Sequence, residues 1–452
     1  MTLPEAIQII VDIDGNLCAA PQAGLVNIGC NRKLSFVCNN KHRRTFTCPP
    51  DGTTYNQPIS AVHRPLTLEL SNEKETDMLT ISAIKADVGS IGGHTRPSRR
   101  MIEAARKNLE QAMNSGMLTG FDVTHTGDDI CLLMVHRLGT SNPQIHDFAW
   151  SVFLAATEIA KSEGLYGAGQ DLLKDAPSGN VRGASPGVAE ITFNETAKER
   201  PAEPFLIFTA DKCGPGAFNF PLWTVFTSPL YCAGLMLPNM RAGFTFRVID
   251  MEHAGGDRIL ELSAPEEHLD LALLLRDENR FGVQAIHARA YEGQQVVSCS
   301  TDRLHTIAGE YKGKDDPVAI VRTQGIFPAP EEVVSPYVVV PYVAGDARGS
   351  HTMPLMPAAI NTPVAGPYCL PLVSCMAYSV TKGGELTEGV DIFGNSVWDQ
   401  ARMKAQQKAE WMRQQGFVGA AMLPMQELEY SAFRDSLAKL EERFSVAEPV
   451  SL

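Results

Sequence analysis

The stretch MLTISAIKAD, residues 78–87, is the first part of the chain with a clear structural pattern. Its apolar and small residues predict a buried strand. Asp87 closes the run and the loop VGSIGGH follows, so a carboxylate stands where this strand ends. In α/β proteins, functional sites are assembled at the carboxyl ends of strands and in the loops after them. The stretch therefore indicates a fold class and a place to search for a site.

Downstream of this strand, helical and strand patterns continue to the end of the chain. Helical periodicity predicts helices at 97–116, 143–164, 398–416 and 433–444. Strands are expected at 121–137 (two strands joined by a Gly-Asp-Asp turn), 205–211, 243–250, 283–300 (a hairpin), 318–323, 337–343 and 369–380. No linker divides this part of the chain. We therefore expect one large α/β domain at residues 78–452, with extensive sheet.

Residues 1–77 have a different character. Four of the ten cysteines lie in the first 48 residues, mixed with basic and Asn-rich text, and no helical or strand period is sustained there. Two interpretations are open: a small appended domain of unknown role, or an artefactual extension upstream of Met78. We assign this part no chemistry.

Composition excludes several classes of protein. The chain has 452 residues, 44% of them hydrophobic and 20% charged, which is ordinary for a globular protein. A formal charge of −13 argues against a nucleic-acid-binding surface, which needs clustered Lys and Arg. No apolar run reaches the roughly 18 residues of a membrane span, and no basic region precedes the first apolar stretch as in a secretory signal. Cysteines scattered through apolar text indicate a reducing cytoplasm.

Carboxylates recur at the ends of the expected elements. They are Asp87, Asp128, Asp129, Asp211, Asp315 and Asp316. Each one alone is more often a cap or turn residue than a ligand. If their loops converge, however, two charges 4 Å apart repel by about 4 kcal/mol at an effective dielectric of 20, so cations must neutralise the cluster. Oxygen ligands favour Mg²⁺ or Mn²⁺, and the shell of Mg²⁺ is commonly completed by substrate phosphates. The set therefore indicates phosphoryl chemistry.

Glycine-rich text is consistent with a phosphorylated ligand. Residues 165–190 are dense in Gly, which permits nests of backbone N–H groups for anions, although a simple loop explains them equally well. Neither a Walker A motif nor G-x-G-x-x-G occurs there, so a nucleotide is not suggested. Arg348 is a candidate bidentate phosphate clamp. His94 and His351 could equally be structural.

Several long motifs resemble one known family. They are KADVGSIGGH (85–94), THTGDDI (124–130), LYGAGQDLLKDAPSGNVRG (165–183), ADKCGPGAFNFPLW (210–223), LHTIAGEYKGKDDPV (304–318), GDARGSHTMPLMP (345–357) and LEY (428–430). In this order they resemble the bifunctional fructose-1,6-bisphosphate aldolase/phosphatases of archaea and deeply branching bacteria. The resemblance implies an α-β-β-α layered sandwich, usually octameric, that acts in gluconeogenesis. Such enzymes condense glyceraldehyde 3-phosphate with dihydroxyacetone phosphate and then remove the 1-phosphate of fructose 1,6-bisphosphate.

The resemblance also implies roles for individual residues. Asp87 matches the phosphatase base, Lys314 the Schiff-base lysine and Tyr311 the aldolase acid/base. The Mg²⁺ ligands would be Asp87, Asp128, Asp129, Gln170, Asp211, Asp315 and Asp316. The sugar-phosphate contacts would be His94, Tyr166, Gly179, Asn180, Lys212, Gln324, Arg348 and Tyr430. One departure is Ala365, which stands where the family has a phosphate-contacting Asp, and residues 432–452 extend beyond the usual end.

The segment YKGKDDP, residues 311–317, explains how two reactions could share one pocket. A Schiff-base lysine must be neutral to attack a ketone, yet two adjacent carboxylates would keep it protonated. If Mg²⁺ occupies those carboxylates, the local field reverses and the amine can lose its proton. Two alternatives stay open: a monofunctional Mg²⁺-dependent sugar phosphatase, in which Lys314 only binds phosphate, and a non-catalytic protein that binds metal or sugar phosphate.

Overall fold

The computed structural model describes two separate units, Met1–Glu75 and Thr76–Leu452. In the second unit it describes residues 78–172, 185–193, 200–253, 257–291, 293–300, 302–303, 314–345, 352–366, 370–414, 432–441 and 443–444. In the first unit it describes four short strands, which pair as β1 (Ile9–Val11) with β2 (Leu17–Ala19) and β3 (Leu34–Val37) with β4 (Arg43–Phe46). The five-stranded and nine-stranded sheets belong to the second unit.

A five-stranded antiparallel sheet is built around the strand predicted at the start of the domain. Its order is β14 (Asp302–Arg303), β8 (Gly187–Phe193), β5 (Leu79–Asp87), β7 (Asp129–His136) and β6 (Gly120–Thr126). Every residue of β5 and β7 is buried, as the apolar runs predict. The expected pair of strands around the Gly-Asp-Asp turn is confirmed as β6 and β7.

A second sheet has nine strands. Along its main path the order is β11 (Ile259–Ala264), β10 (Phe244–Asp250), β12 (Phe281–Ala288), β13 (Gln295–Cys299), β15 (Val318–Arg322), β9 (Ala202–Asp211), β19 (Leu372–Thr381) and β18 (Met356–Pro357). The short β20 (Val390–Asp391) pairs with β19, and β16 (Tyr342–Ala344) pairs with β17 (Thr352–Pro354) as a separate ribbon. Most neighbours in this sheet are antiparallel.

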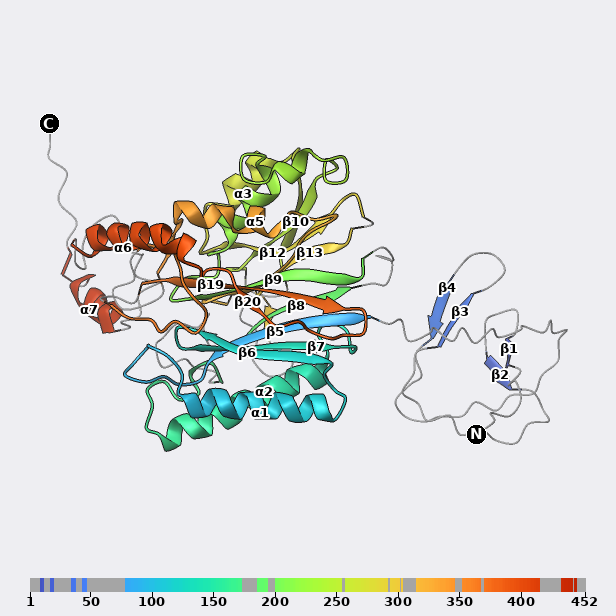
Figure 1. Ribbon diagram of the computed structural model, residues 1–452, viewed down its shortest axis with the longest axis horizontal. Coiled ribbons are helices and arrows are strands. Elements are labelled where there is room, and N and C mark those ends of the chain that lie inside the picture. Colours follow the sequence, from blue (N-terminus) through green and yellow to red (C-terminus); the bar gives the residue numbers. More distant parts are fainter. Residues whose placement is uncertain are drawn as a thin grey trace. The chain divides into compact units, whose positions relative to one another are not determined.

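Helices cover the outer face of each sheet (Figure 1). The five-stranded sheet is covered by α1 (Arg99–Asn114) and α2 (Pro143–Ser162), whose N-termini are capped by the side chains of Ser98 and Asn142. The nine-stranded sheet is covered by α3 (Asn219–Thr227), α4 (His268–Leu275), α5 (Pro330–Val334) and α6 (Asp399–Arg413). Four described 3₁₀ helices are η1 (Gln170–Leu172), η3 (Ala233–Met236), η4 (Ser335–Val339) and η5 (Ser396–Trp398), and α7 (Ala432–Glu441) follows near the end.

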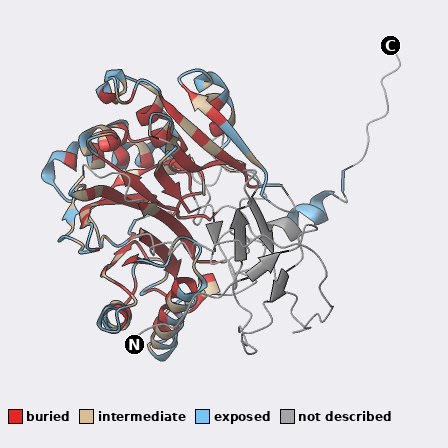
Figure 2. Cartoon of the chain, turned by 90° about the vertical axis from the view of Figure 1, so that its right-hand side faces the viewer, coloured by how far each residue is buried: buried red, intermediate tan, exposed pale blue. Residues whose placement is uncertain are grey.

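Three apolar cores hold these layers together, and the alternation of side chains along β5 shows how. Ile81 and Ala83 belong to the core between the two sheets, whereas Ile84 and Ala86 belong to the core beneath α1 and α2. A third core lies between the nine-stranded sheet and its helices. Burial is accordingly continuous through both sheets (Figure 2). The predicted α/β class is confirmed.

One predicted strand is wrong in part. Residues 337–343 were expected to be extended, but Ser335–Val339 forms η4, and only Tyr342–Ala344 is a strand. Pro336 and Pro341 cannot donate ladder hydrogen bonds, and Val340 has a left-handed φ of 56°, which breaks an extended run. Among the described helices, none is both long and apolar enough to cross a membrane.

Candidate active site

The candidate site lies where the apolar core between the two sheets becomes charged. Along β5, Ile81, Ala83, Lys85 and Asp87 point to the same side, because strand side chains alternate. The first two pack in the inter-sheet core, whereas Lys85 and Asp87 are buried polar residues. Asp87 lies directly opposite Asp129 in the ladder between β5 and β7. A cross-strand pair of carboxylates is destabilising unless cations lie near it.

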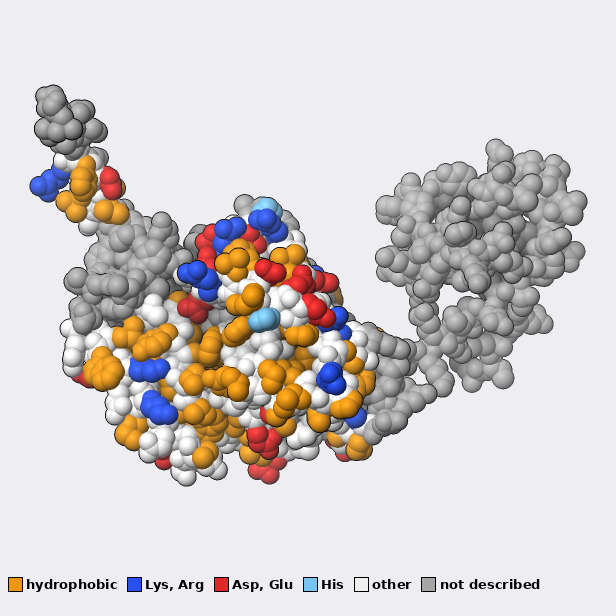
Figure 3. All heavy atoms as spheres, turned by 90° about the horizontal axis from the view of Figure 1, so that it is seen from above, with side chains coloured by type: hydrophobic (Ala, Val, Ile, Leu, Met, Phe, Trp, Pro, Cys, Tyr) orange, Lys and Arg blue, Asp and Glu red, His pale blue; other side chains and the backbone are white. Residues whose placement is uncertain are grey.

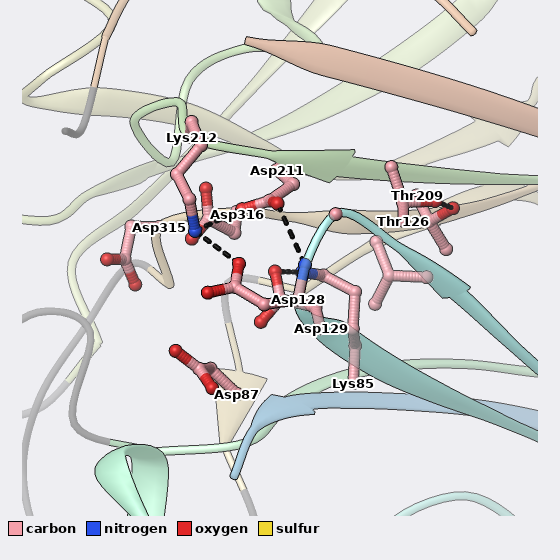
Figure 4. A network of polar contacts seen from close by, with 12 residues as sticks. Lys85, Asp87, Thr126, Asp128, Asp129, Thr209, Asp211, Lys212, Asp315 and Asp316 are labelled. Atoms are coloured by element: carbon pink, nitrogen blue, oxygen red, sulfur yellow. Dashed lines mark hydrogen bonds and ion pairs between the residues drawn. The ribbon is translucent and has the colours of Figure 1, made fainter. Parts of the chain in front are cut away.

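Carboxylates from the second sheet complete the cluster (Figure 4). Asp211 is the last residue of β9, and Asp315 and Asp316 lie just before β15, separated from it by Pro317; β15 pairs with β9. A hydrogen bond of 2.6 Å between the hydroxyl groups of Thr126 and Thr209 joins the two sheets near this edge. The six aspartates at predicted element ends are therefore gathered between the two sheets, and all six are buried.

Two acidic groups within this cluster could each hold a cation. Asp87, His94 and Asp128 form one group, and Asp129, Asp211 and Asp316 form the other; in each, ligand atoms lie within 4.8 Å of one another. Asp128 Oδ2 and Asp211 Oδ1 are buried and accept no hydrogen bond of suitable geometry from the described residues. Their described contacts are ion pairs, of Asp128 Oδ2 with His94 at 3.3 Å and of Asp211 Oδ1 with Lys212 at 2.9 Å, and a divalent cation bound by oxygen ligands would add to these.

Three buried lysines lie among the carboxylates. Lys85 forms an ion pair with Asp129, and Lys212 forms ion pairs with Asp128 and Asp211, the latter at 2.9 Å. Lys212 has a left-handed φ of 65°, which turns the chain at the end of β9. These ammonium groups offset part of the negative charge in the structure without bound ions.

Lys314 is the third buried lysine. Its Nζ donates to Asp315 Oδ1 at 2.8 Å and lies 3.2 Å from Asp171 Oδ2. Burial alone would lower the pKa of Lys314, but Asp171 and Asp315 raise this pKa well above its usual value. Without bound cations the amine is therefore an ammonium, as the sequence of the segment predicts.

The carboxylates respond to the same environment. Burial and the neighbouring Asp128 raise the pKa of Asp87 well above its usual value, and burial with Asp129 raises the pKa of Asp316 to about 7. Burial would also raise the pKa of Asp128, but Lys212 and His94 hold it below its usual range. Ionisation of the Asp87 and Asp316 carboxyl groups is therefore unfavourable unless a cation lies close to them.

His94 and Tyr166 are more exposed than the aspartates of the cluster. His94 Nδ1 is 3.3 Å from Asp128 Oδ2, and its ring meets the ring of Tyr166 edge to face at 4.9 Å. Tyr166 is held by paired backbone hydrogen bonds with Ser90 and is 49% exposed, so the phenol is accessible. Gln170 lies nearby in chain and structure, in the 3₁₀ turn that also contains Asp171.

Gln324 is not brought to this cluster. The five-residue strand β15 carries the chain away from Asp316 over about 17 Å. Gln324 is exposed at the far end, where its backbone carbonyl accepts a hydrogen bond from Arg200 Nη1 at 2.6 Å. Five further predicted residues lie outside the described part of the chain: Tyr311, Gly179, Asn180, Arg348 and Tyr430. Ala365 is exposed, next to Val364, whose N–H donates to the Thr95 carbonyl.

Two residues of the cluster, Lys85 and Asp171, were not predicted from the sequence. Lys85 could have been found, because it lies two positions before Asp87 on the same strand face. Asp171 had only a weak signal, its position directly after Gln170 in the glycine-rich text. Both are buried polar residues in the structure.

Comparison with known proteins identifies the family. The sequence model described as fructose-1,6-bisphosphatase matches residues 78–445. The chain belongs to this family. The match contains the whole cluster of aspartates and lysines described above.

Curated relatives in the family carry a more specific name. A protein of Thermus thermophilus named fructose-1,6-bisphosphate aldolase/phosphatase is 50% identical over 368 residues, covering 81% of this chain and 99% of the relative. Proteins of the same name from Cenarchaeum symbiosum and Methanothermobacter marburgensis are each 43% identical, covering 81% of this chain and 94% and 98% of the relatives. The resemblance noted in the sequence is therefore confirmed at the level of the family.

Proposed function

We propose that the chain is a bifunctional gluconeogenic enzyme. It condenses glyceraldehyde 3-phosphate with dihydroxyacetone phosphate through a Schiff base on Lys314, and it then hydrolyses the 1-phosphate of fructose 1,6-bisphosphate to give fructose 6-phosphate. The observation that carries this proposal is the position of Lys314, a buried amine within 2.8 Å of Asp315 at the edge of two acidic groups. The names of relatives that match nearly their full length support both activities.

Several Mg²⁺ ions are the cofactors in this proposal. Their ligands would be Asp87, Asp128, Asp129, Gln170, Asp211, Asp315 and Asp316. The all-oxygen character of these side chains favours Mg²⁺ over softer metals. When bound, Mg²⁺ supplies the positive charge that stabilises the phosphoryl group during transfer.

In the hydrolytic reaction, Asp87 is the base that takes a proton from the attacking water. His94 and Lys212, both at the cluster, bind phosphate oxygens. The remaining contacts with the sugar phosphate are assigned to Tyr166, Gly179, Asn180, Arg348 and Tyr430.

In the aldol reaction, the neutral Lys314 amine attacks the ketone carbon of dihydroxyacetone phosphate, and one water leaves as the imine forms. Tyr311, three residues earlier, moves the protons of this reaction. The raised pKa of Lys314 opposes the first step, since Asp171 and Asp315 stabilise the ammonium. Cations bound to the carboxylates reverse this effect and link the two reactions to one metal-loaded pocket.

We further propose that the stacked layers form the α-β-β-α sandwich of the family and that the protein works as a homo-octamer in the cytoplasm. Self-association is supported by exposed hydrophobic side chains on the helical side of the nine-stranded sheet, where apolar groups are spread between charged ones (Figure 3). They include Leu230, Met236, Leu269 and Leu273.

The test is conversion of the two triose phosphates to fructose 6-phosphate with Mg²⁺. We expect turnover that excess chelator removes and added Mg²⁺ restores. Borohydride in the presence of dihydroxyacetone phosphate should trap an adduct on Lys314, read by mass spectrometry. Hydrolysis of fructose 1,6-bisphosphate without any trapped adduct would favour the alternative, a monofunctional Mg²⁺-dependent sugar phosphatase in which Lys314 binds phosphate. Absence of all turnover would leave only a binding protein.

A further inference from the structure

Asp171 connects the two residues that the proposed reactions depend on. It is 3% exposed and lies in the 3₁₀ turn η1. Its Oδ2 accepts a hydrogen bond of 2.8 Å from the backbone N–H of Asp87 and lies 3.2 Å from Lys314 Nζ. Its Oδ1 accepts a longer bond of 3.4 Å from the same amine. One carboxylate thus holds the end of β5 and the side chain of Lys314.

Among the described residues, Asp171 lies outside the two acidic groups whose ligand atoms are within 4.8 Å of one another, and it is not one of the proposed metal ligands. The two acidic groups consist of Asp87, His94 and Asp128 and of Asp129, Asp211 and Asp316. Asp315 is also in contact with Lys314, but it is a proposed metal ligand, and a bound ion would neutralise its negative charge. Among the described carboxylates in contact with Lys314, Asp171 is then the one that is not a proposed metal ligand.

The stem of Lys314 is confined by the start of β8. A Cβ atom on Gly187, the first residue of β8, would lie 2.9 Å from Lys314 Cγ and 3.1 Å from Ser300 Cβ. The backbone of β8 therefore approaches the lysine stem as closely as a glycine permits. Together, Gly187 behind the stem and Asp171 at the amine define where Nζ lies.

We propose that Asp171 is a positioning residue for the aldol reaction, which holds the Lys314 amine in place relative to the end of β5 so that it can attack the substrate ketone. The inference rests on the proposed Schiff-base function. Asp171 takes no part in bond making: the amine adds to the ketone, water leaves, and the imine forms on Lys314. Asp171 provides the fixed acceptor from which the amine is aimed.

The matched experiment compares imine trapping with phosphate release on each variant. Asp171→Asn keeps an oxygen that can accept from the Asp87 N–H but removes the charge that holds the amine. Because loss of this charge also favours the neutral amine, a fall in trapping reports misplacement of Nζ and not a failure to lose the proton. We expect borohydride trapping of dihydroxyacetone phosphate, measured by protein mass, to fall at least about tenfold, because small misplacements of a reacting atom cost up to about a hundredfold. Phosphate release from fructose 1,6-bisphosphate should fall by less than about threefold.

The control for losing a buried, hydrogen-bonded carboxylate is Asp250→Asn. Asp250 is 4% exposed, accepts from the Glu252 N–H and pairs with Arg258 and Arg280 at the end of β10. We expect this variant to leave the ratio of trapping to phosphate release at the parent value. If Asp171→Asn also keeps this ratio and lowers both reactions in parallel, the role of Asp171 is merely structural and the inference is overturned.

A second variant acts on the lysine stem and not on the amine. Gly187→Ala should push the lysine stem by a few tenths of an ångström and also lower trapping more than phosphate release. If both variants trap the adduct at the parent rate, the inference is wrong while the proposed function stands. If the parent enzyme itself traps no adduct, the Schiff-base function fails, and this inference fails with it.

Discussion

Gly127 lies against the carboxylate of Asp211, in the turn between β6 and β7. A Cβ atom at residue 127 would come within 1.4 Å of Asp211 Oδ2 and 2.7 Å of Val364 Cγ2. The φ angle of 55° at Gly127 also lies in the left-handed region. The N–H of Asp128 donates to the same Asp211 oxygen at 3.2 Å. Close packing of this turn against β9 is what brings carboxylates of the two sheets together.

Gly127→Ala should therefore disable the whole cluster. The new methyl group must displace Asp211, and we expect both trapping and phosphate release to fall by about a hundredfold or more. The matched control is Gly116→Ala, because Gly116 has a φ of 81° but nothing within 4 Å of its Cβ position. This control carries the backbone strain without the collision and should keep both activities. Equal losses in the two variants would show that strain alone, rather than contact with Asp211, explains the effect.

Lys314→Arg should abolish aldol condensation. A guanidinium stays protonated at any working pH and cannot form the imine. Hydrolysis of added fructose 1,6-bisphosphate should persist in part, because the positive charge beside Asp315 is kept and the proposed ligands are intact. The measurements are adduct mass after borohydride and phosphate release. Condensation at the parent rate would make the Schiff-base role untenable.

Asp87→Asn should show the opposite preference. It removes the proposed base and one proposed metal ligand, so phosphate release should fall by about a hundredfold or more. Imine trapping should fall less, because Asp87 meets Asp171 through its backbone N–H, which the substitution keeps. Parallel measurement with Lys314→Arg gives two variants with reversed ratios. A variant that hydrolyses at the parent rate would contradict the role of Asp87.

Stability should depend on pH through His136, at the opposite end of β7. His136 Nε2 is 2.8 Å from Ser82 Oγ, which donates to Glu190, and Nδ1 accepts from the Leu138 N–H at 3.2 Å. Burial lowers the pKa of His136 to about 4, with Glu190 opposing and His146 adding to this effect. The folded state therefore disfavours the imidazolium.

The sign follows from this lowered pKa. The contribution of His136 to the free energy of unfolding is fully present above the unfolded pKa of about 6.5. It is lost as the pH falls toward the folded pKa of about 4, and the total loss is about 3 kcal/mol. His136→Gln can donate to Ser82 and accept from Leu138 without titrating. Urea unfolding at pH 7, 5.5 and 4.5 should show a smaller loss of unfolding free energy for this variant than for the parent. Identical pH dependence would rule out His136 as a source.

A chain that begins at Met78 should fold and keep both activities. The family match starts at residue 78, and residues Thr76–Leu452 form one of the two units of the structure. The expected outcome is a cooperative thermal transition and both turnover rates within about twofold of the full chain. Insoluble or inactive protein from the shorter chain would show that residues 1–77 are needed for folding.

The elements of this domain were predictable where the signal is local. Alternation and apolar runs indicated β5, β7, β9 and β19, and helical periodicity indicated α1 and α2. The sequence also shows aspartates at the ends of these elements, so an acidic cluster could be predicted without the tertiary structure. Residues 337–343 show the limit, because a β-branched run between prolines became η4 once it packed beside α3 and α5.

Proximity between distant residues depended on the tertiary structure. Asp171 and Lys314 are 143 positions apart, and no local pattern pairs them. They meet because η1 contacts the end of β5 and because two sheets stack with their charged ends in register. Gln324 separates from Lys314 for the converse reason, since a five-residue extended strand lies between them. Local sequence determines which face a side chain takes, whereas long-range strand pairing and sheet stacking determine what lies opposite that face.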